Sequence, residues 1–177
     1  MYSLQADEKT TPVMIYGRDR LIRGEVVTKE SALVSRWLRT QGAPTYMHVL
    51  KANLISFGVG APRVDNFEEV YFPTSECLSF HLTPPATDPL DYETTEQNRL
   101  MQPMTLLVGS FLFQGLLRVS AMTDLPTTME GNRLPWLSFY EITISNPALP
   151  QMRLSVPMAL INAALMIYGL GQPGSLK

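Results

Sequence analysis

The sequence is poor in cysteine, in histidine and in charge, and each shortage excludes something. Cys77 is the only cysteine, so the chain cannot form an internal disulfide, and no Asn-x-Ser/Thr glycosylation sequence occurs. The first residues, MYSLQADEKTTP, lack the basic start and apolar run of a signal peptide. From these absences we expect a cytoplasmic protein.

Charged side chains make up 17% of the chain, against roughly 25% in average soluble domains, and the formal net charge is −2. A chain without excess positive charge does not bind nucleic acid or anionic membranes unspecifically. The longest uncharged apolar run, residues 158–170, is shorter than the roughly 20 residues that a membrane-spanning helix needs. The sequence therefore predicts a protein without a membrane partner.

The common signatures of catalytic and metal sites are missing as well. No CxxC, HxH, HExxH, GxSxG, GxGxxG or P-loop sequence is present, and the only histidines are His48 and His81. Cys77 and His81 are the one possible thiol and imidazole pair, but their spacing along a strand would place them about 13 Å apart. We expect no enzyme activity, no catalytic residue, no metal site and no cofactor.

An internal repeat organises the chain. Residues 12–27 (PVMIYGRDRLIRGEVV) and 103–118 (PMTLLVGSFLFQGLLR) align at an offset of 91, and in each half the same two kinds of apolar block follow. The repeat predicts two copies of one domain, and a single irregular β domain is the alternative. The residues matched at this offset are Pro12 and Pro103, Leu21 and Leu112, Gly24 and Gly115, and Pro44 and Pro135.

An acidic stretch with several prolines separates the two copies and is typical of a linker. Its carboxylates, on Asp88, Asp91, Glu93 and Glu96, are interpreted as solvated groups of a flexible segment. The predicted organisation is a first domain at residues 10–83, a linker at 84–101, a second domain at 102–170 and a flexible tail at 171–177.

Short apolar blocks rich in Val, Ile, Leu, Phe and Tyr, interrupted by Gly or Pro, predict an all-β fold. Hairpin turns are expected at residues 17–19 and 109–110. Gly24 and Gly115 fall inside expected strands, where a glycine indicates a sharp bend or a close backbone approach. Residues 157–170 are expected to form a turn and a strand, with a helix of about three turns as the alternative.

Five short strands per copy, a glycine in the second strand and a proline-marked turn before the last strand resemble the Sm-like (LSm) small barrel, one of the SH3-like barrels. The resemblance implies two tandem five-stranded barrels. Basic residues bind RNA at the turns of that family, whereas the expected turns here read FPTS (72–75) and VPMA (156–159). Ring assembly through the fourth and fifth strands stays open, with VYF (70–72) and LSV (154–156) as the expected edges.

Arginines of the first copy form the strongest polar cluster in the sequence. Guanidinium groups bind phosphate or carboxylate, and a tryptophan among them could stack on a base. The alternatives are a solvated face balanced by nearby acidic residues, and a core position for the tryptophan. The expected anion or nucleic-acid surface comprises Arg18, Arg20, Arg23, Arg36, Trp37 and Arg39.

The second copy has the opposite character, because residues 103–177 carry only seven charged side chains. An isolated domain so poor in charge would expose large apolar patches, which usually mark an interface. We expect this copy to be buried against the first copy, against another subunit or against a partner, or else to share one core with the first copy.

The leading functional hypothesis is a non-enzymatic assembly or protein-interaction module that forms a homo-oligomer, such as a ring of tandem barrels, or binds a protein partner. Binding of RNA or single-stranded DNA through the arginine surface is the second hypothesis. Small-molecule binding between the two barrels is the third. The sequence does not identify the biological role, the ligand or the partner.

Overall fold

The computed structural model describes residues 2–40, 42–93, 95–131 and 134–170. The first half contains β1 (Glu8–Tyr16), β2 (Arg20–Lys29), the 3-10 helix η1 (Val34–Arg39), β3 (Tyr46–Ser56), β4 (Arg63–Pro73), the 3-10 helix η2 (Thr74–Glu76) and β5 (Ser79–Leu82). The second half contains β6 (Arg99–Val108), β7 (Phe111–Ser120), the helix α1 (Leu125–Gly131), β8 (Trp136–Asn146), β9 (Leu149–Asn162), the 3-10 helix η3 (Ala163–Leu165) and β10 (Ile167–Gly169).

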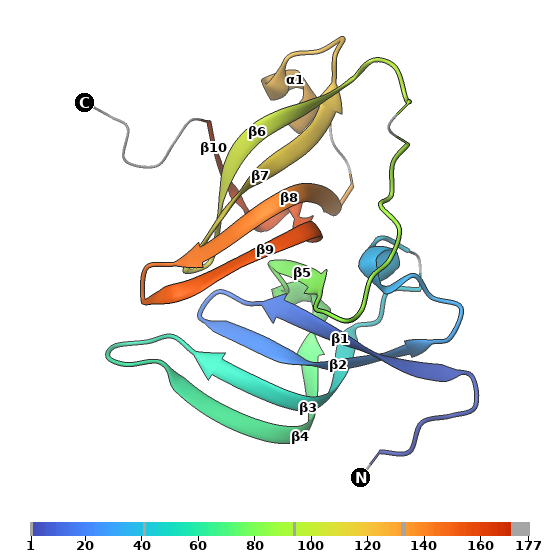
Figure 1. Cartoon of the computed structure of the whole chain (residues 1–177), viewed down its shortest axis with the longest axis vertical. Coiled ribbons are helices and arrows are strands. Elements are labelled where there is room, and N and C mark those ends of the chain that lie inside the picture. Colours follow the sequence, from blue (N-terminus) through green and yellow to red (C-terminus); the bar gives the residue numbers. More distant parts are fainter. Residues whose placement is uncertain (1, 41, 94, 132–133, 171–177) are drawn as a thin grey trace.

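These ten strands form one antiparallel sheet in the order β10-β6-β7-β8-β9-β5-β1-β2-β3-β4 (Figure 1). Each half contributes its strands in the same order, with the fifth strand next to the first, and β5 and β9 join the two halves. The predicted all-β fold is confirmed. The sheet is open and ends in β10 on one side and β4 on the other, while its division into two barrels remains a prediction.

The expected hairpin turns form in both halves of the chain. Hairpins turn at residues 17–19 and 109–110 as expected, and Gly109 has a φ of 60°, which favours glycine. In the first half, η2 follows Pro73 at the predicted turn. Residues 157–170 form no long helix, and the expected turn and final strand follow as η3 and β10, later in the chain than predicted.

The turn predicted at residues 156–159 is wrong, because these residues continue β9 and the chain turns only at η3. Pro157 is tolerated inside β9 because β5 pairs with this strand only at Leu160 and Ile161, so no ladder hydrogen bond is lost on that side. Residues 154–156, also expected at an edge, pair with β8 on one side, and β5 pairs with β9 only farther along, at Leu160 and Ile161. Residues 70–72 belong to the edge strand β4.

The start of β6 differs from the predicted end of the linker. β6 begins at Arg99, so residues 99–101 of the predicted linker pair with β7. β1 begins at Glu8, two residues before the predicted domain start. The predicted tail at 171–177 lies outside the described residues.

Gly24 and Gly115 lie where β2 and β7 pass close to the next strand. A Cβ atom on Gly24 would lie 2.6 Å from Val49 Cγ1 and 2.8 Å from the Leu50 carbonyl oxygen, and one on Gly115 would lie 2.6 Å from the Tyr140 carbonyl oxygen. The pairing register shifts at both glycines, as in a β-bulge. The extra residue of each bulge belongs to the neighbouring strand, β3 or β8, where Lys51 and Glu141 both have a φ of 49°.

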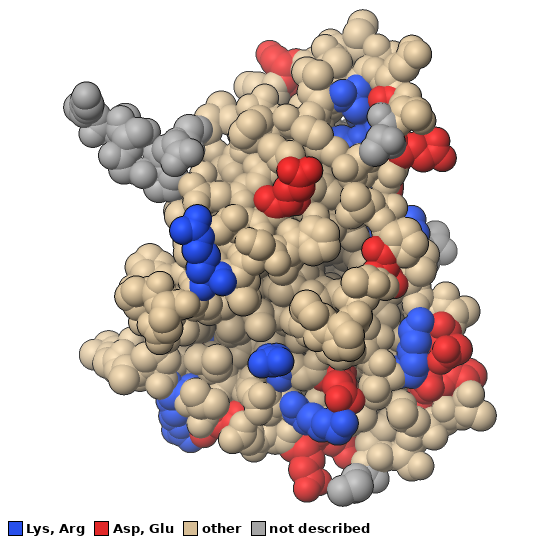
Figure 2. All heavy atoms as spheres, in the orientation of Figure 1, with Lys and Arg blue, Asp and Glu red and all other residues tan. Residues whose placement is uncertain are grey.

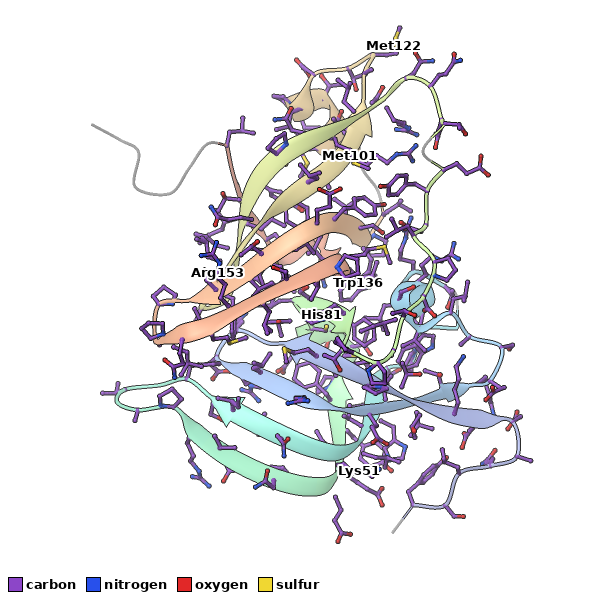
Figure 3. The ribbon with its side chains drawn as sticks, viewed as in Figure 1. Lys51, His81, Met101, Met122, Trp136 and Arg153 are labelled. Carbon is purple, nitrogen blue, oxygen red and sulfur yellow. The ribbon has the colours of Figure 1, made fainter. Side chains whose placement is uncertain are left out.

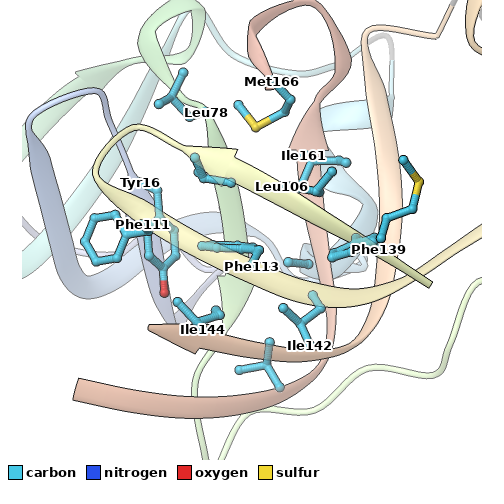
Figure 4. Close-up of a cluster of buried hydrophobic side chains, with 14 of the residues drawn as sticks. Tyr16, Leu78, Leu106, Phe111, Phe113, Phe139, Ile142, Ile144, Ile161 and Met166 are labelled. Atoms are coloured by element: carbon cyan, nitrogen blue, oxygen red, sulfur yellow. The ribbon is translucent and has the colours of Figure 1, made fainter. Parts of the chain in front are cut away.

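Two apolar clusters form the core, and each contains residues of both halves. One surrounds Phe111 and Phe113 and includes Tyr16 and Leu78 of the first half (Figure 4). The other lies under β1 to β4 and includes Trp136 and Leu160 of the second half. The second copy is thus buried against the first, and the two halves share both apolar clusters.

We expect Gly115→Ala to lower the free energy of unfolding by about 2–3 kcal/mol, because the Cβ would collide with backbone that cannot move away. Gly58→Ala is the matched control, since a Cβ there meets nothing within 4 Å. Urea unfolding followed by circular dichroism measures both. An equal effect of the two substitutions would contradict the close approach at Gly115.

Candidate functional site

The six residues of the predicted arginine surface do not lie together. Arg18 and Arg20 stand at the β1–β2 turn, whereas Arg36, Trp37 and Arg39 belong to η1, which follows the far end of β2 (Figure 1). The ten residues of β2 span about 30 Å. Strand geometry therefore places the two groups at opposite ends of β2.

Several members of that set already have partners. Arg20 Nε lies 2.8 Å from the Asp19 carboxylate, and Arg39 pairs with Asp91. Arg23 is exposed on β2, between the two groups. Trp37 is half-buried and packs against the core. Trp136, the other tryptophan considered for stacking, is 5% exposed and belongs to that core, so it cannot stack on a base.

The open edges of the sheet carry exposed apolar side chains. On β4 these include Val64, Phe67 and Tyr71, and on β10 Ile167 is 65% exposed. Figure 2 shows broad uncharged areas between isolated charges on the face in view. Unpaired backbone beside apolar side chains is the chemistry that pairs with another strand.

The β4 edge also carries an aromatic cluster that the sequence did not reveal. The Tyr71 ring stacks on the His48 ring with centroids 4.5 Å apart, and His48 Nε2 lies 3.2 Å from Glu69 Oε2. The Tyr2 backbone N–H donates to Glu69 Oε1 at 2.8 Å, and its ring contacts His48 edge-on. The N-terminal segment is thereby held against the outer end of the sheet.

Among the described residues, strands of the two halves pair only at the junction between β5 and β9. Ser79 lies opposite Ile161, and Phe80 lies opposite Leu160. The Asn162 backbone N–H donates to the Leu78 carbonyl at 2.9 Å, and the Ser79 hydroxyl donates to the Leu160 carbonyl at 2.9 Å. Two ladder pairs and these two hydrogen bonds thus connect the sheet of one half to that of the other.

The segment between the end of β5 at Leu82 and the start of β6 at Arg99 is called the connecting segment here. Asp91 attaches it to both halves. Its carboxylate pairs with Arg39 of η1 and accepts hydrogen bonds from Ser138 and Tyr140 of β8. Burial raises the pKa of this carboxyl, but the hydrogen bonds from Ser138 and Tyr140 and the charge of Arg39 outweigh burial, so the pKa lies below its ordinary value. The interpretation of Asp91 as a solvated linker group is wrong, because its side chain is only 4% exposed.

Asp88 is also engaged, since it accepts a hydrogen bond from the Ser35 backbone N–H at 2.8 Å. The sequence contained a weak sign of this attachment. Asp91 lies between Leu90 and Tyr92, so an apolar and an aromatic side chain flank it in an otherwise polar segment. That pattern indicates a segment that touches the protein rather than a free linker.

A buried polar group of the molecule surrounds His81 of β5, which Figure 3 labels. His81 Nδ1 donates to the Leu82 carbonyl oxygen at 2.7 Å, so Nε2 accepts from the Tyr16 hydroxyl at 3.0 Å. Cys77 Sγ contacts the Ser79 carbonyl oxygen instead of His81, and burial raises the pKa of the thiol. These side chains satisfy one another inside the core.

Among the described residues, no group of three or more His, Cys, Asp and Glu side chains is placed to hold a metal ion. In the same residues no helix has the length and apolar character needed to cross a membrane. Comparisons with protein-family models, with curated proteins and with solved structures found no match.

Replacing Asp91 with asparagine should lower the free energy of unfolding by about 2–3 kcal/mol, since Arg39 would lose its buried ionic partner. Glu93→Gln serves as the control, because Glu93 is an exposed carboxylate of the same segment. Chemical unfolding of both variants tests this. A loss below about 0.5 kcal/mol for Asp91→Asn would show that the segment is not fastened there.

The buried His81 should make stability depend on pH. Burial lowers the pKa of His81 from 6.5 to about 4, whereas the unfolded chain binds a proton near pH 6.5. The contribution of neutral His81 is therefore complete above pH 6.5 and is lost as the pH falls toward 4. Between pH 7 and pH 5 this loss should amount to about 2 kcal/mol.

Urea unfolding at both pH values measures the effect. The His81→Gln variant should lose this part of the pH dependence while keeping a side chain that can bond to Tyr16. If wild type and variant lose equal stability between pH 7 and pH 5, His81 is not the group responsible.

Proposed function

We propose that the chain is a non-enzymatic assembly protein made of two tandem Sm-like barrels, whose copies join head to tail through β4 of one chain and β10 of the next. The β5–β9 junction carries this proposal. It pairs the fifth strand of one half with the fourth strand of the other, and the two strands left without a partner at the ends of the sheet are again a fourth and a fifth strand.

The internal junction supplies the register expected between chains. Phe72 of β4 and Ile161 of β9 are equivalent positions, because each pairs with the second residue of the preceding strand, β3 or β8. Ile167 of β10 and Ser79 of β5 are also equivalent, because their partners Leu107 and Tyr16 align at the offset of 91. Transferring the Ser79–Ile161 pair therefore places Ile167 opposite Phe72, and Tyr168 opposite Tyr71.

The side chains at both edges suit such a contact. Tyr71 is 58% exposed and Ile167 is 65% exposed, and Leu165 and Leu170 beside β10 are exposed as well. Pairing would remove these apolar groups from water and would supply partners for edge backbone groups. Because the two edges differ, the contact is heterologous, and repeated copies close into a ring when the rotation between them allows it.

The first test is the mass of the purified protein by size-exclusion chromatography with light scattering, recorded at 260 and 280 nm. The wild type should elute as an oligomer with a protein spectrum. Tyr71→Lys and Ile167→Lys should each give monomers, because a buried lysine at either edge opposes strand pairing.

Mixing the two variants separates head-to-tail pairing from other contacts. Tyr71→Lys keeps an intact β10 and Ile167→Lys keeps an intact β4, so an equimolar mixture should form a dimer and nothing larger. Met122→Glu, a 77% exposed position away from both edges, should leave the oligomer intact. A monomeric wild type, or an oligomer that survives both lysine variants, would overturn the proposal, and co-eluting nucleic acid would favour the second hypothesis.

A further inference from the structure

A recess lies where η1, the connecting segment and strands β7 and β8 meet. Its volume is about 240 Å³, and an adjoining hollow shares two of its arginines. The side chains that line the recess carry three positive charges and one negative charge, and Glu96 of the adjoining hollow pairs with two of these arginines. The charged and hydroxyl-bearing residues that line it are Arg39, Asp91, Arg99, Arg118, Ser138 and Tyr140.

One of these cations is held in a fixed position. Asp91 pairs with Arg39 and is itself 4% exposed, and the Ser138 hydroxyl accepts a hydrogen bond from Arg39 Nη1 at 2.9 Å. Because Asp91 also accepts from Tyr140, it cannot leave without exposing several polar groups. Arg39 therefore keeps its place, and 32% of its side chain faces solvent.

The other two arginines hold a carboxylate that can be replaced. Glu96 accepts hydrogen bonds from Arg99 Nε and Arg118 Nη2, and these bonds lower the pKa of its carboxyl. The Glu96 side chain is 44% exposed, and such exposed ion pairs contribute about 0–1 kcal/mol. Arg118 is further positioned over the Tyr92 ring, 5.1 Å from its centroid.

We infer that this recess binds a small molecule through a phosphate or carboxylate group, which displaces Glu96 from between Arg99 and Arg118 and approaches Arg39. Guanidinium groups on three different elements converge there, and their forks match the geometry of such anions. The site goes beyond assembly and uses neither sheet edge.

Another recess among the described residues has two arginines in its lining rather than three. Arg18 and Arg20 line it together with Asp19 and Glu76, so its charges balance. Arg20 already pairs with Asp19 at 2.8 Å. The comparison favours the recess at Arg118 as the site for an anion.

Isothermal titration calorimetry at low salt tests the inference with inorganic phosphate, citrate and a nucleoside triphosphate as probes, since salt screens such contacts. Arg118→Gln should weaken the binding of the best probe by about tenfold or more. Glu96→Gln should tighten it by about threefold or more, because the competing carboxylate is gone. A residue that only stabilises the fold would not produce opposite effects in these two variants.

Arg153→Gln is the control, because Arg153 is an exposed arginine of β9 outside this recess. It should bind like the wild type. Equal affinity for inorganic phosphate and the triphosphate would identify a free anion as the ligand, and tighter binding of the triphosphate would identify an organic phosphate that also uses the adjoining hollow. No binding of any probe at roughly 10 mM, or no tightening in Glu96→Gln, would overturn the inference.

Discussion

Strand β5 connects the two halves of the sheet through its pairing with β9, which is the shortest pairing between strands of the described residues. It pairs with β1 along four residues and with β9 along only two, yet both apolar clusters continue across it. Tyr16 shows why so short a ladder suffices. Its ring packs edge-on against Phe111 and Phe113, with ring centroids 4.9 and 5.0 Å apart, so aromatic rings of the second half contact the first half directly. The hydrogen bonds set the register, and the apolar side chains around them supply the area that is buried.

The connecting segment adds a polar attachment at the side of this junction. Asp91 joins η1 of the first half to β8 of the second, and Asp88 joins the segment to Ser35. Without these attachments, only the two-residue ladder and the shared apolar clusters would hold the halves together. With both carboxylates engaged, the segment fixes the orientation of the halves and at the same time shapes the recess beside Arg118.

Features that depend on neighbouring residues were predictable, and those that depend on distant pairing were not. Gly109 and Gly115 could be placed from turn and strand rules, because a glycine marks a local backbone requirement. The internal position of β9 could not, because the same apolar alternation suits an edge strand and a covered one. The spread of the predicted arginine set has a related cause: Arg20 and Arg36 are close in sequence, but an extended strand lies between them. The recess was not predictable either, because Arg39 and Arg118 belong to different halves and only the packing of the halves brings them to one recess.

Pro73 would make the proposed junction between chains weaker than the internal one. In the alignment of the halves it stands where Asn162 stands, and Asn162 uses its backbone N–H to bond Leu78 across the internal junction. Proline has no N–H, so a junction made by β4 would lack that bond. The internal junction also forms within one chain, where its partner is always at hand, whereas an external one depends on protein concentration. Dilution would then release whole chains, each still a folded pair of halves, and the chain rather than the single half would be the unit of exchange.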